Sequence, residues 1–352
     1  MTPRERVLAA FDRRPVDCIP TDYWAVPEVT DRLLAHFGVE NTIDLWPRLG
    51  VDKIINIKPK YVGPPLVDTD EVRVDYWGVE RRRHEHPGGV YYEISRWPLA
   101  EYASIDEIEA SYTWPSADWF DFSEVADEIA KYPGYAIEAG YMAPFYMFNN
   151  ARGLEQSLLD MGTDPDLAQY IIDRSTDFLI EYHTRLFEAG HGRIDLTQVT
   201  DDLGCQHGLL ISPASFDRFL AKPYQRCIEL ARSAGIRVFH HDDGAMAEML
   251  PRLVDLGIQI LNPVQWRLPG MNPIRLKQRY RDRIAFHGAI DNQYVLPFGT
   301  LAEVEEEVAF CISALASDGT GYVLAPCHNI QGITPVENVI RMYDAARSIG
   351  RR

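Results

Sequence analysis

The 352-residue chain has few cysteines, no long hydrophobic run and no block of like charges. Its five cysteines are odd in number and widely spaced, at Cys18, Cys205, Cys227, Cys311 and Cys327. We therefore expect free thiols and a reducing cytoplasm rather than a disulfide framework. No stretch approaches the roughly 18 consecutive apolar residues of a membrane span. The N-terminus carries charge where a signal peptide needs an apolar run. These absences predict a cytoplasmic protein without a membrane partner.

The chain also lacks a glycine-rich phosphate loop after its first expected strand, which argues against a dinucleotide-binding fold. Lysine and arginine number 35 against 52 acidic residues, a formal net charge of −17. This charge would repel the phosphates of a nucleic acid, so a nucleic-acid partner is not expected. Apolar residues make up 46% of the chain, enough for a large core. A small-molecule substrate is the partner that composition leaves open.

From about residue 135 onward, short apolar segments alternate with longer amphipathic ones. The expected strands span residues 135–139, 194–199, 237–241, 259–263, 283–287 and 321–325. The expected helices span residues 167–189, 213–234, 246–256, 273–280, 301–316 and 334–349. This alternation implies right-handed βαβ units and a parallel sheet. It predicts an α/β fold, a (β/α)₈ TIM barrel, with an open doubly wound sheet as the alternative. One domain over residues 1–352 is expected, because such barrels commonly exceed the usual domain size of about 150 residues.

The N-terminal part has a different pattern. A helix is expected at residues 2–11, a first strand at 18–24 and an amphipathic helix at 29–37. Residues 72–79 and 90–94 alternate apolar and polar side chains, and a Pro-Gly-Gly segment separates the halves. We predict an antiparallel β-hairpin, inserted at about residues 58–98. The charged segment 80–86 is interpreted as part of its turn, with His84 and His86 solvated.

Polar side chains follow five consecutive expected strands. They are Asp201 and Asp202; His241 and Asp243; Asn262 and Gln265; His287 and Asp291; and Cys327, His328 and Asn329. The active site of a (β/α)₈ barrel lies at the carboxyl ends of its strands. These side chains are therefore expected to gather around one pocket, centred on residues 239–244.

The segment His241-x-Asp243 is the most specific local pattern. Residues i and i+2 of a strand point to the same side, so His241 and Asp243, rather than His240 and Asp242, are expected to face the pocket. Two such donors can share a metal ion, with Cys327 or His328 as the third ligand. Three protein ligands with an open fourth position are typical of catalytic zinc. The alternative is a metal-free polar cluster that positions an organic substrate.

Other residues have both a structural and a functional interpretation. Asp201 and Asp202 are either a turn or helix-capping pair, or acid/base groups, since adjacent carboxylates raise one pKa when both face inward. Asn262 and Gln265 are expected to bind substrate rather than to react. The aromatic residues after residue 140 are expected in the core, with one or two, such as Tyr141, lining the pocket. Cys205, Cys227 and Cys311 are expected to be packing residues.

An ordered series of motifs strongly resembles the uroporphyrinogen decarboxylase superfamily. The motifs are Asp201-Asp202-Leu203-Gly204, Ile211-Ser212-Pro213, Lys222-Pro223, the His-x-Asp-Gly stretch at 241–244, and the segments 260–265, 286–291, 325–331 and 334–338. No single motif is decisive, but their order is specific, and the likeness extends over essentially residues 2–347. The resemblance implies the (β/α)₈ barrel.

This superfamily contains two chemistries. Its true decarboxylases need no metal and bind an acidic tetrapyrrole through an arginine-rich N-terminal segment. Here that region reads Ile19-Pro20-Thr21-Asp22-Tyr23-Trp24, without an arginine pair. Its corrinoid-linked methyltransferases bind zinc through a His-x-Cys pair and a later cysteine. This chain has His241-x-Asp243 at the position of that pair, and Cys327 followed by His328 at the later position.

The resemblance implies a zinc-dependent methyltransferase or demethylase that acts on a small methylated substrate with a separate corrinoid protein or another methyl carrier. In that scheme His241, Asp243 and Cys327 or His328 hold zinc, and Asp201 or Asp202 acts with His241 in catalysis. The substrate would contact Tyr141, Asn262, Gln265, His287, Asp291 and Asn329. Metal-free decarboxylation in porphyrin metabolism and non-catalytic binding of a corrinoid or small molecule remain alternatives. A homodimer is expected from the resemblance alone.

Overall fold

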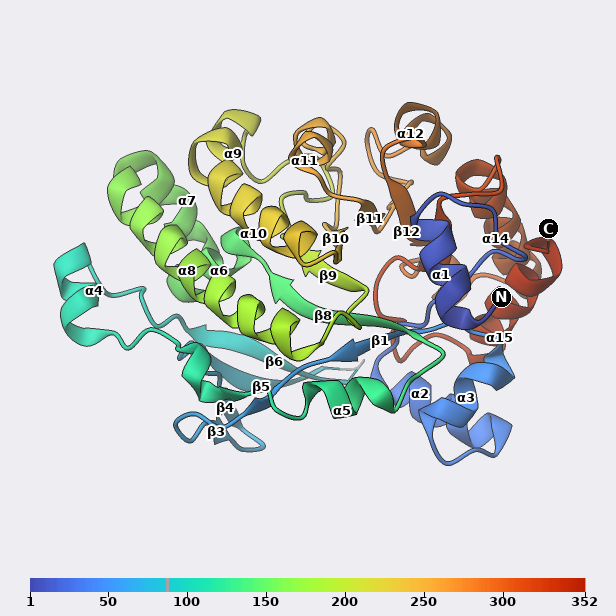
Figure 1. The fold of residues 1–352 in the computed structure, drawn as a ribbon, viewed down its shortest axis with the longest axis horizontal. Coiled ribbons are helices and arrows are strands. Elements are labelled where there is room, and N and C mark those ends of the chain that lie inside the picture. Colours follow the sequence, from blue (N-terminus) through green and yellow to red (C-terminus); the bar gives the residue numbers. More distant parts are fainter. Residues whose placement is uncertain (87–88, 352) are drawn as a thin grey trace.

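The computed structural model describes residues 1–86 and 89–351, and a curled parallel sheet forms its centre (Figure 1). Among these residues the sheet has seven strands in the order β1-β8-β9-β10-β11-β12-β13. They are β1 (Ile54–Ile57), β8 (Ala136–Met142), β9 (Leu196–Val199), β10 (Arg237–His241), β11 (Ile260–Asn262), β12 (Ala285–Ile290) and β13 (Tyr322–Pro326). Each neighbouring pair is parallel. The predicted strands from residue 135 onward are all present, with ends shifted by a few residues.

Residues 20–24 lie between the two outer strands of this sheet. The Asp22 amide donates to the Leu324 carbonyl on β13 at 2.9 Å, and the Leu324 amide donates to the Pro20 carbonyl at 2.9 Å. On the other side, the Asp52 amide before β1 donates to the Thr21 carbonyl at 2.9 Å. The predicted first strand is thus reduced to isolated bridges, such as Thr21 with Leu324. The curled sheet with this segment is consistent with a TIM-like barrel.

Helices alternate with these strands and cover the outside of the sheet (Figure 1). The helices that follow β8 to β13 are α6 (Pro144–Arg152), α7 (Leu154–Thr163), α8 (Pro165–Ala189), α9 (Pro213–Phe219), α10 (Ala221–Ser233), α11 (Leu250–Leu256), α12 (Pro273–Tyr280), α13 (Val295–Phe298), α14 (Leu301–Leu315) and α15 (Val336–Ile349). The single helix expected at 213–234 divides at Leu220. Pro223, which cannot donate a backbone hydrogen bond, explains the break.

The N-terminal helices are α1 (Pro3–Phe11), α2 (Pro27–Phe37), α3 (Thr42–Leu49), α4 (Ile105–Ser111) and α5 (Val125–Ala130). The first begins with a capping box, in which Thr2 and Glu5 each bond the other's backbone amide. Phe11 at its end packs against Phe239 and His287. This helix therefore closes the amino-terminal end of the sheet, opposite the strand ends that carry the polar residues. No helix of the described chain is long and apolar enough to cross a membrane.

The region expected to form a hairpin contains more antiparallel strands than predicted. Strands β3 (Val67–Asp68), β4 (Val72–Val74), β5 (Glu80–His86) and β6 (Gly89–Arg96) form one sheet, and β2 (Lys60–Tyr61) pairs with β7 (Phe120–Asp121). The interpretation of residues 80–86 as a turn is wrong, because they form β5, which pairs with both β4 and β6. Ion pairs such as Arg81–Asp75 stabilise this strand without an apolar pattern. Residues 87–88 and the side chain of His86 lie outside the described residues.

Candidate functional site

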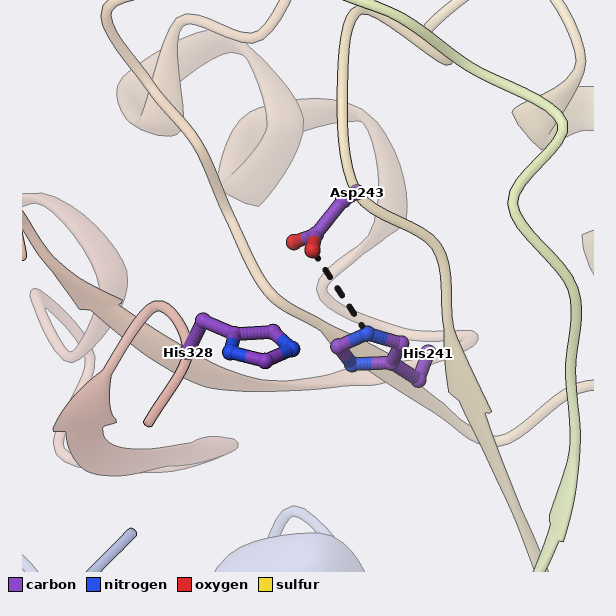
Figure 2. Close-up of side chains that lie close together, drawn as sticks. All are labelled: His241, Asp243 and His328. Carbon is purple, nitrogen blue, oxygen red and sulfur yellow. Dashed lines mark ion pairs between the residues drawn. The ribbon is translucent and has the colours of Figure 1, made fainter. Parts of the chain in front are cut away.

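Three of the predicted side chains meet at the carboxyl ends of β10 and β13. His241 ends β10, Asp243 follows it, and His328 comes from the loop after β13 (Figure 2). One ligand atom from each lies within 4.8 Å of the others. Nε2 of His241 is 3.7 Å from Oδ2 of Asp243, and the rings of His241 and His328 have centroids 5.7 Å apart. We call these residues the His-Asp-His group.

A chain of hydrogen bonds fixes the orientation of His241. Its Nδ1 lies 2.5 Å from Oδ1 of Asn262, whose Nδ2 lies 2.7 Å from Nδ1 of His287. Nε2 of His287 is 3.2 Å from Oδ2 of Asp22. Asn262, His287 and Asp22 are fully buried. The chain therefore runs from the His-Asp-His group, through three further side chains, to the segment between β13 and β1.

The direction of each bond follows from the charge on Asp22. Burial alone would raise the pKa of Asp22, but Lys53 and the hydrogen bonds from His287 and Ile54 outweigh it and hold this pKa below its ordinary value. The carboxylate thus accepts a hydrogen bond from Nε2–H of His287, whose own pKa is lowered by burial, so the ring is neutral. Asn262 must then donate to Nδ1 of His287 and accept from Nδ1 of His241.

With Nδ1 bonded to Asn262, Nε2 of His241 faces the Asp243 carboxylate. Two acceptors 3.7 Å apart repel one another unless a proton or a cation lies between them. Oδ1 of Asp243 is buried and has no hydrogen-bond partner among the described residues. Burial raises the pKa of Asp243, while His241 and His328 lower it, and burial lowers the pKa of His328. The group is suited to hold a metal ion.

The alternation along β10 separates this group from the neighbouring His240 and Asp242. Both are fully buried, and Nδ1 of His240 bonds the Val199 carbonyl at 2.8 Å. Oδ1 of Asp242 accepts the backbone amides of Leu203 and Gly204, each at 3.1 Å. These contacts hold the loop after β9 against β10, and neither residue belongs to the His-Asp-His group.

The two aspartates after β9 have different environments. Asp201 is buried and accepts the amides of Phe145 at 3.0 Å and Tyr146 at 2.6 Å, and the Tyr224 hydroxyl at 2.8 Å. Burial raises its pKa well above the ordinary value. Asp201 therefore caps α6, as the helix-capping interpretation of this residue predicts. Asp202 is exposed, and its charge raises the pKa of both Asp243 and His328, so it lies near the group.

Several predicted substrate ligands form hydrogen bonds within the protein. Asn262 and His287 belong to the hydrogen-bond chain, and Gln265 accepts the Gly244 amide. Asp291 accepts the Gln293 amide at 2.7 Å and forms an ion pair with Arg267. These hydrogen bonds and this ion pair support the loops after β11 and β12.

Cys327 is buried, and its Sγ lies 3.8 Å from the Val264 carbonyl. Together with Gln265 and Asp291 it lines a small separate pocket. Burial raises the pKa of this thiol well above its ordinary value. Of the two alternatives for the third ligand, the structure groups His328, and not Cys327, with His241 and Asp243.

A cavity of about 400 Å³ opens beside the hydrogen-bond chain, between residues 22–25 and strands β1, β8 and β9. Its lining includes Asn329, one of the predicted substrate residues, but not Tyr141, whose side chain is exposed and edge-on to Tyr146. The polar residues Asp22, Lys53, Asn56, Glu138 and Gln198 also line it. Sequence reasoning missed these five. An acidic residue inside each of the expected strands 18–24 and 135–139 was the available signal.

The comparisons with known proteins agree with this architecture. Residues 130–349 match the model of the uroporphyrinogen decarboxylase (URO-D) family. A methyltransferase from Methanosarcina mazei has a TM-score of 0.69 and 20% identity, covering 99% of each chain. A B12-independent methionine synthase from Shewanella sp. W3-18-1, in complex with selenomethionine, has a TM-score of 0.50 and 12% identity, over 94% of this chain and 98% of that chain. A comparison with curated proteins found no match.

At these identities the two solved structures show a shared fold. The family match covers more than half of the chain and includes β8 to β13, from which the His-Asp-His group and Glu138 come. It confirms the resemblance that the motif series indicates. The chain belongs to the uroporphyrinogen decarboxylase family.

Proposed function

We propose that this protein is a (β/α)₈-barrel methyltransferase or demethylase that uses a zinc ion held by His241, Asp243 and His328. The observation that carries the proposal is the position of His241 Nε2, which the chain through Asn262 directs toward Oδ2 of Asp243, a carboxylate whose other oxygen, Oδ1, is buried without a hydrogen-bond partner among the described residues. The methyltransferase with the same fold over 99% of both chains supports this choice within the family.

The residues fit a catalytic zinc site. In a tetrahedral site with bonds of about 2.1 Å, ligand atoms lie roughly 3.4 Å apart, close to the 3.7 Å between His241 and Asp243. Two imidazoles and one carboxylate leave a fourth position open for substrate. The bond from His241 to Asn262 supplies the outer hydrogen bond that zinc-binding histidines usually make.

This ligand set differs from the cysteine-containing set that the resemblance implies. Nitrogen and oxygen donors give less electron density to zinc than thiolates, so the ion is a stronger Lewis acid. When bound, it would stabilise negative charge on a leaving oxygen or nitrogen. In the transfer itself, the bond between the methyl carbon and that heteroatom breaks with its electron pair on the heteroatom. A lone pair of the acceptor forms the new bond.

The chain's own residues would do the rest of the work. Asn262, His287 and Asp22 keep His241 in the tautomer that offers Nε2. Asp202, exposed beside the group, would exchange a proton with the leaving heteroatom. The methyl carrier in this proposal is a corrinoid on a separate protein or another small carrier. Uroporphyrinogen decarboxylation has less support, because Lys53, the one cation among the described residues that line the cavity, is already paired with Asp22.

Metal analysis of the protein purified without chelator tests the proposal. We expect about one equivalent of zinc, and faster methyl transfer with free cobalamin as carrier when zinc is added. Less than about a tenth of an equivalent, with no gain in activity on adding zinc, would refute the metal-dependent part.

Four variants test which residues hold the ion. His241→Ala and His328→Ala should each lower zinc affinity at least about 100-fold, because each removes a ligand. Cys327→Ser should change it less than about twofold, since Sγ lies outside the group. His207→Ala, at an exposed histidine, is the matched control. If Cys327→Ser lost zinc and His328→Ala kept it, the ligand assignment would be wrong.

A further inference from the structure

The cavity beside the hydrogen-bond chain has a feature that the proposed transfer does not use, a buried carboxylate without a counter-ion. We propose that this cavity binds a small cationic amine, of the methylated ammonium class. Its charge would be balanced by Glu138, and its methyl groups would lie against the aromatic residues of the lining. That this amine is the substrate rests on the proposed function; that the cavity binds it does not.

Glu138 is held rigidly with one oxygen left over. It lies on β8 and is 6% exposed. Its Oε1 accepts Nδ2 of Asn56 at 3.1 Å and Nε2 of Gln198 at 2.9 Å. No hydrogen bond from the described residues reaches Oε2, and this atom is not among the buried polar atoms that lack a partner. Oε2 is therefore in contact with the cavity that the residue lines.

The other charges around the cavity cancel one another. Nζ of Lys53 is 3.2 Å from Oδ1 of Asp22 and donates to the Tyr23 carbonyl at 2.9 Å. Asp22 also accepts hydrogen bonds from the Tyr23 amide, the Trp24 indole, the Ile54 amide and His287. It has no capacity left for a ligand. Glu138 forms no ion pair with any described residue, so its carboxyl group lacks a counter-ion, and burial raises its pKa.

An isolated buried carboxylate is costly unless it is protonated or paired with a cation. An anionic ligand would meet Glu138 and would have to displace Asp22 from Lys53. A neutral ligand would leave the charge of Glu138 uncompensated. A cation is the ligand that removes this cost.

The aromatic part of the lining fits the same ligand class. Tyr23, Trp24 and Trp46 all line the cavity. Trp24 donates its indole N–H to Asp22 at 2.7 Å, which fixes the ring. Methylated ammonium ions bind preferentially against aromatic faces, where the ring electrons attract the charge spread over the methyl groups. Tryptophan is the strongest of these partners.

Trp24 also connects the cavity to the proposed reaction centre. Its ring centroid is 5.9 Å from that of His241 and 5.4 Å from that of His287. Asn329, next to His328, lines the cavity as well. Trp24 therefore borders both the cavity that Glu138 lines and the ring of His241.

Calorimetric titration of the protein as purified, with no methyl carrier, tests the proposal. The probes are tetramethylammonium, choline and 3,3-dimethylbutan-1-ol, the last of which has the shape of choline without its charge. We expect both cations to bind and the neutral alcohol to bind at least about tenfold more weakly. Absence of cation binding at millimolar concentration, or equal binding of choline and the alcohol, would overturn the proposal.

Glu138→Gln is the matching variant. Its amide oxygen can still accept from Asn56 and Gln198, so the fold should be retained, but an N–H group then faces the cavity. We expect the affinity for choline to fall at least about tenfold while that for the alcohol stays unchanged. Glu101→Gln, at an exposed position, controls for the change in net charge. Unchanged choline affinity, or equal losses for both probes, would count against recognition by charge. A protein that binds choline but no zinc would disprove only the proposed transfer.

Discussion

The two sides of the curled sheet, at the carboxyl ends of its strands, organise polar residues in different ways. On the side of β10 to β13, the His-Asp-His group is partly exposed. The hydrogen bonds through Asn262 and His287 orient His241 so that its Nε2 faces Asp243. On the side of β1 to β9, Glu138 is buried and its two amide partners leave one oxygen facing a cavity. The first arrangement suits an ion that several side chains share, and the second suits a ligand that brings its own charge. Asp22 contacts both sides.

The largest expected effect comes from Asp22, because it belongs to both regions. Asp22→Asn removes the partner of Lys53 and leaves five donors around a group that itself donates. We expect the free energy of unfolding, measured with denaturant, to fall by about 4 kcal/mol, as for other broken buried ion pairs. Lys53→Met in the Asp22→Asn background should restore part of the loss. A loss below about 1 kcal/mol would mean that Asp22 does not hold the two regions together.

On the cavity side, the free energy of unfolding should depend on pH through His183, which packs behind β8. His183 bonds the Leu179 carbonyl through Nδ1 at 2.6 Å and accepts the Tyr141 amide through Nε2 at 2.9 Å, which braces the irregular end of β8. Burial lowers its pKa from 6.5 to about 4. Because the folded protein favours the neutral ring, this contribution is fully present above pH 6.5 and is lost as the pH falls toward 4. The loss should be about 3 kcal/mol.

The measurement is the free energy of unfolding between pH 7 and pH 4 for the protein and for His183→Gln. The glutamine can still donate to the Leu179 carbonyl but does not titrate, so its curve should be flatter over this range. His207→Gln, at an exposed histidine, serves as the control and should follow the unmodified protein. Parallel curves for the protein and His183→Gln would show that this histidine does not cause the acid sensitivity.

The smallest expected effect concerns the link behind His241. Asn262→Leu removes the acceptor that orients the ring, and we expect zinc affinity to fall about 10- to 100-fold. Asn262→Asp keeps an acceptor for Nδ1 of His241 but loses the donor to His287, so its loss should be smaller. Competition with a zinc chelator measures both. Equal affinity in the two variants and the unmodified protein would show that the metal side does not depend on this chain.

The sequence predicted the fold in the region where strands and helices alternate, and less well before residue 135. The prediction of a turn at residues 80–86 was wrong because ion pairs, rather than an alternation of apolar side chains, stabilise β5. The sequence pattern did not predict helix α6. Without that helix, nothing in the sequence showed that Asp201 caps its first turn. The two-residue period of a strand did separate His241 and Asp243 from His240 and Asp242.

Other parts of the site depend on contacts between distant segments. The choice between Cys327 and His328 depends on how the loop after β13 turns, which no local pattern encodes. Asn262 and His287 were expected to bind substrate, since their position at strand ends does not show that they bond each other. Asp22 and Glu138 come from segments 116 positions apart in sequence and meet only around the cavity.

The two sides come largely from different parts of the chain, so most of the cavity wall and the His-Asp-His group can change separately in sequence. The family match begins at residue 130 and contains the His-Asp-His group, while Trp24, Trp46, Lys53 and Asn56 precede it. Most of the cavity wall therefore comes from the first 60 residues, and so does Asp22, which ends the hydrogen-bond chain behind His241. A chimera that takes its N-terminal segment from another family member would therefore receive a new cavity wall, and it would keep the support behind His241 only if that segment supplied a carboxylate in place of Asp22.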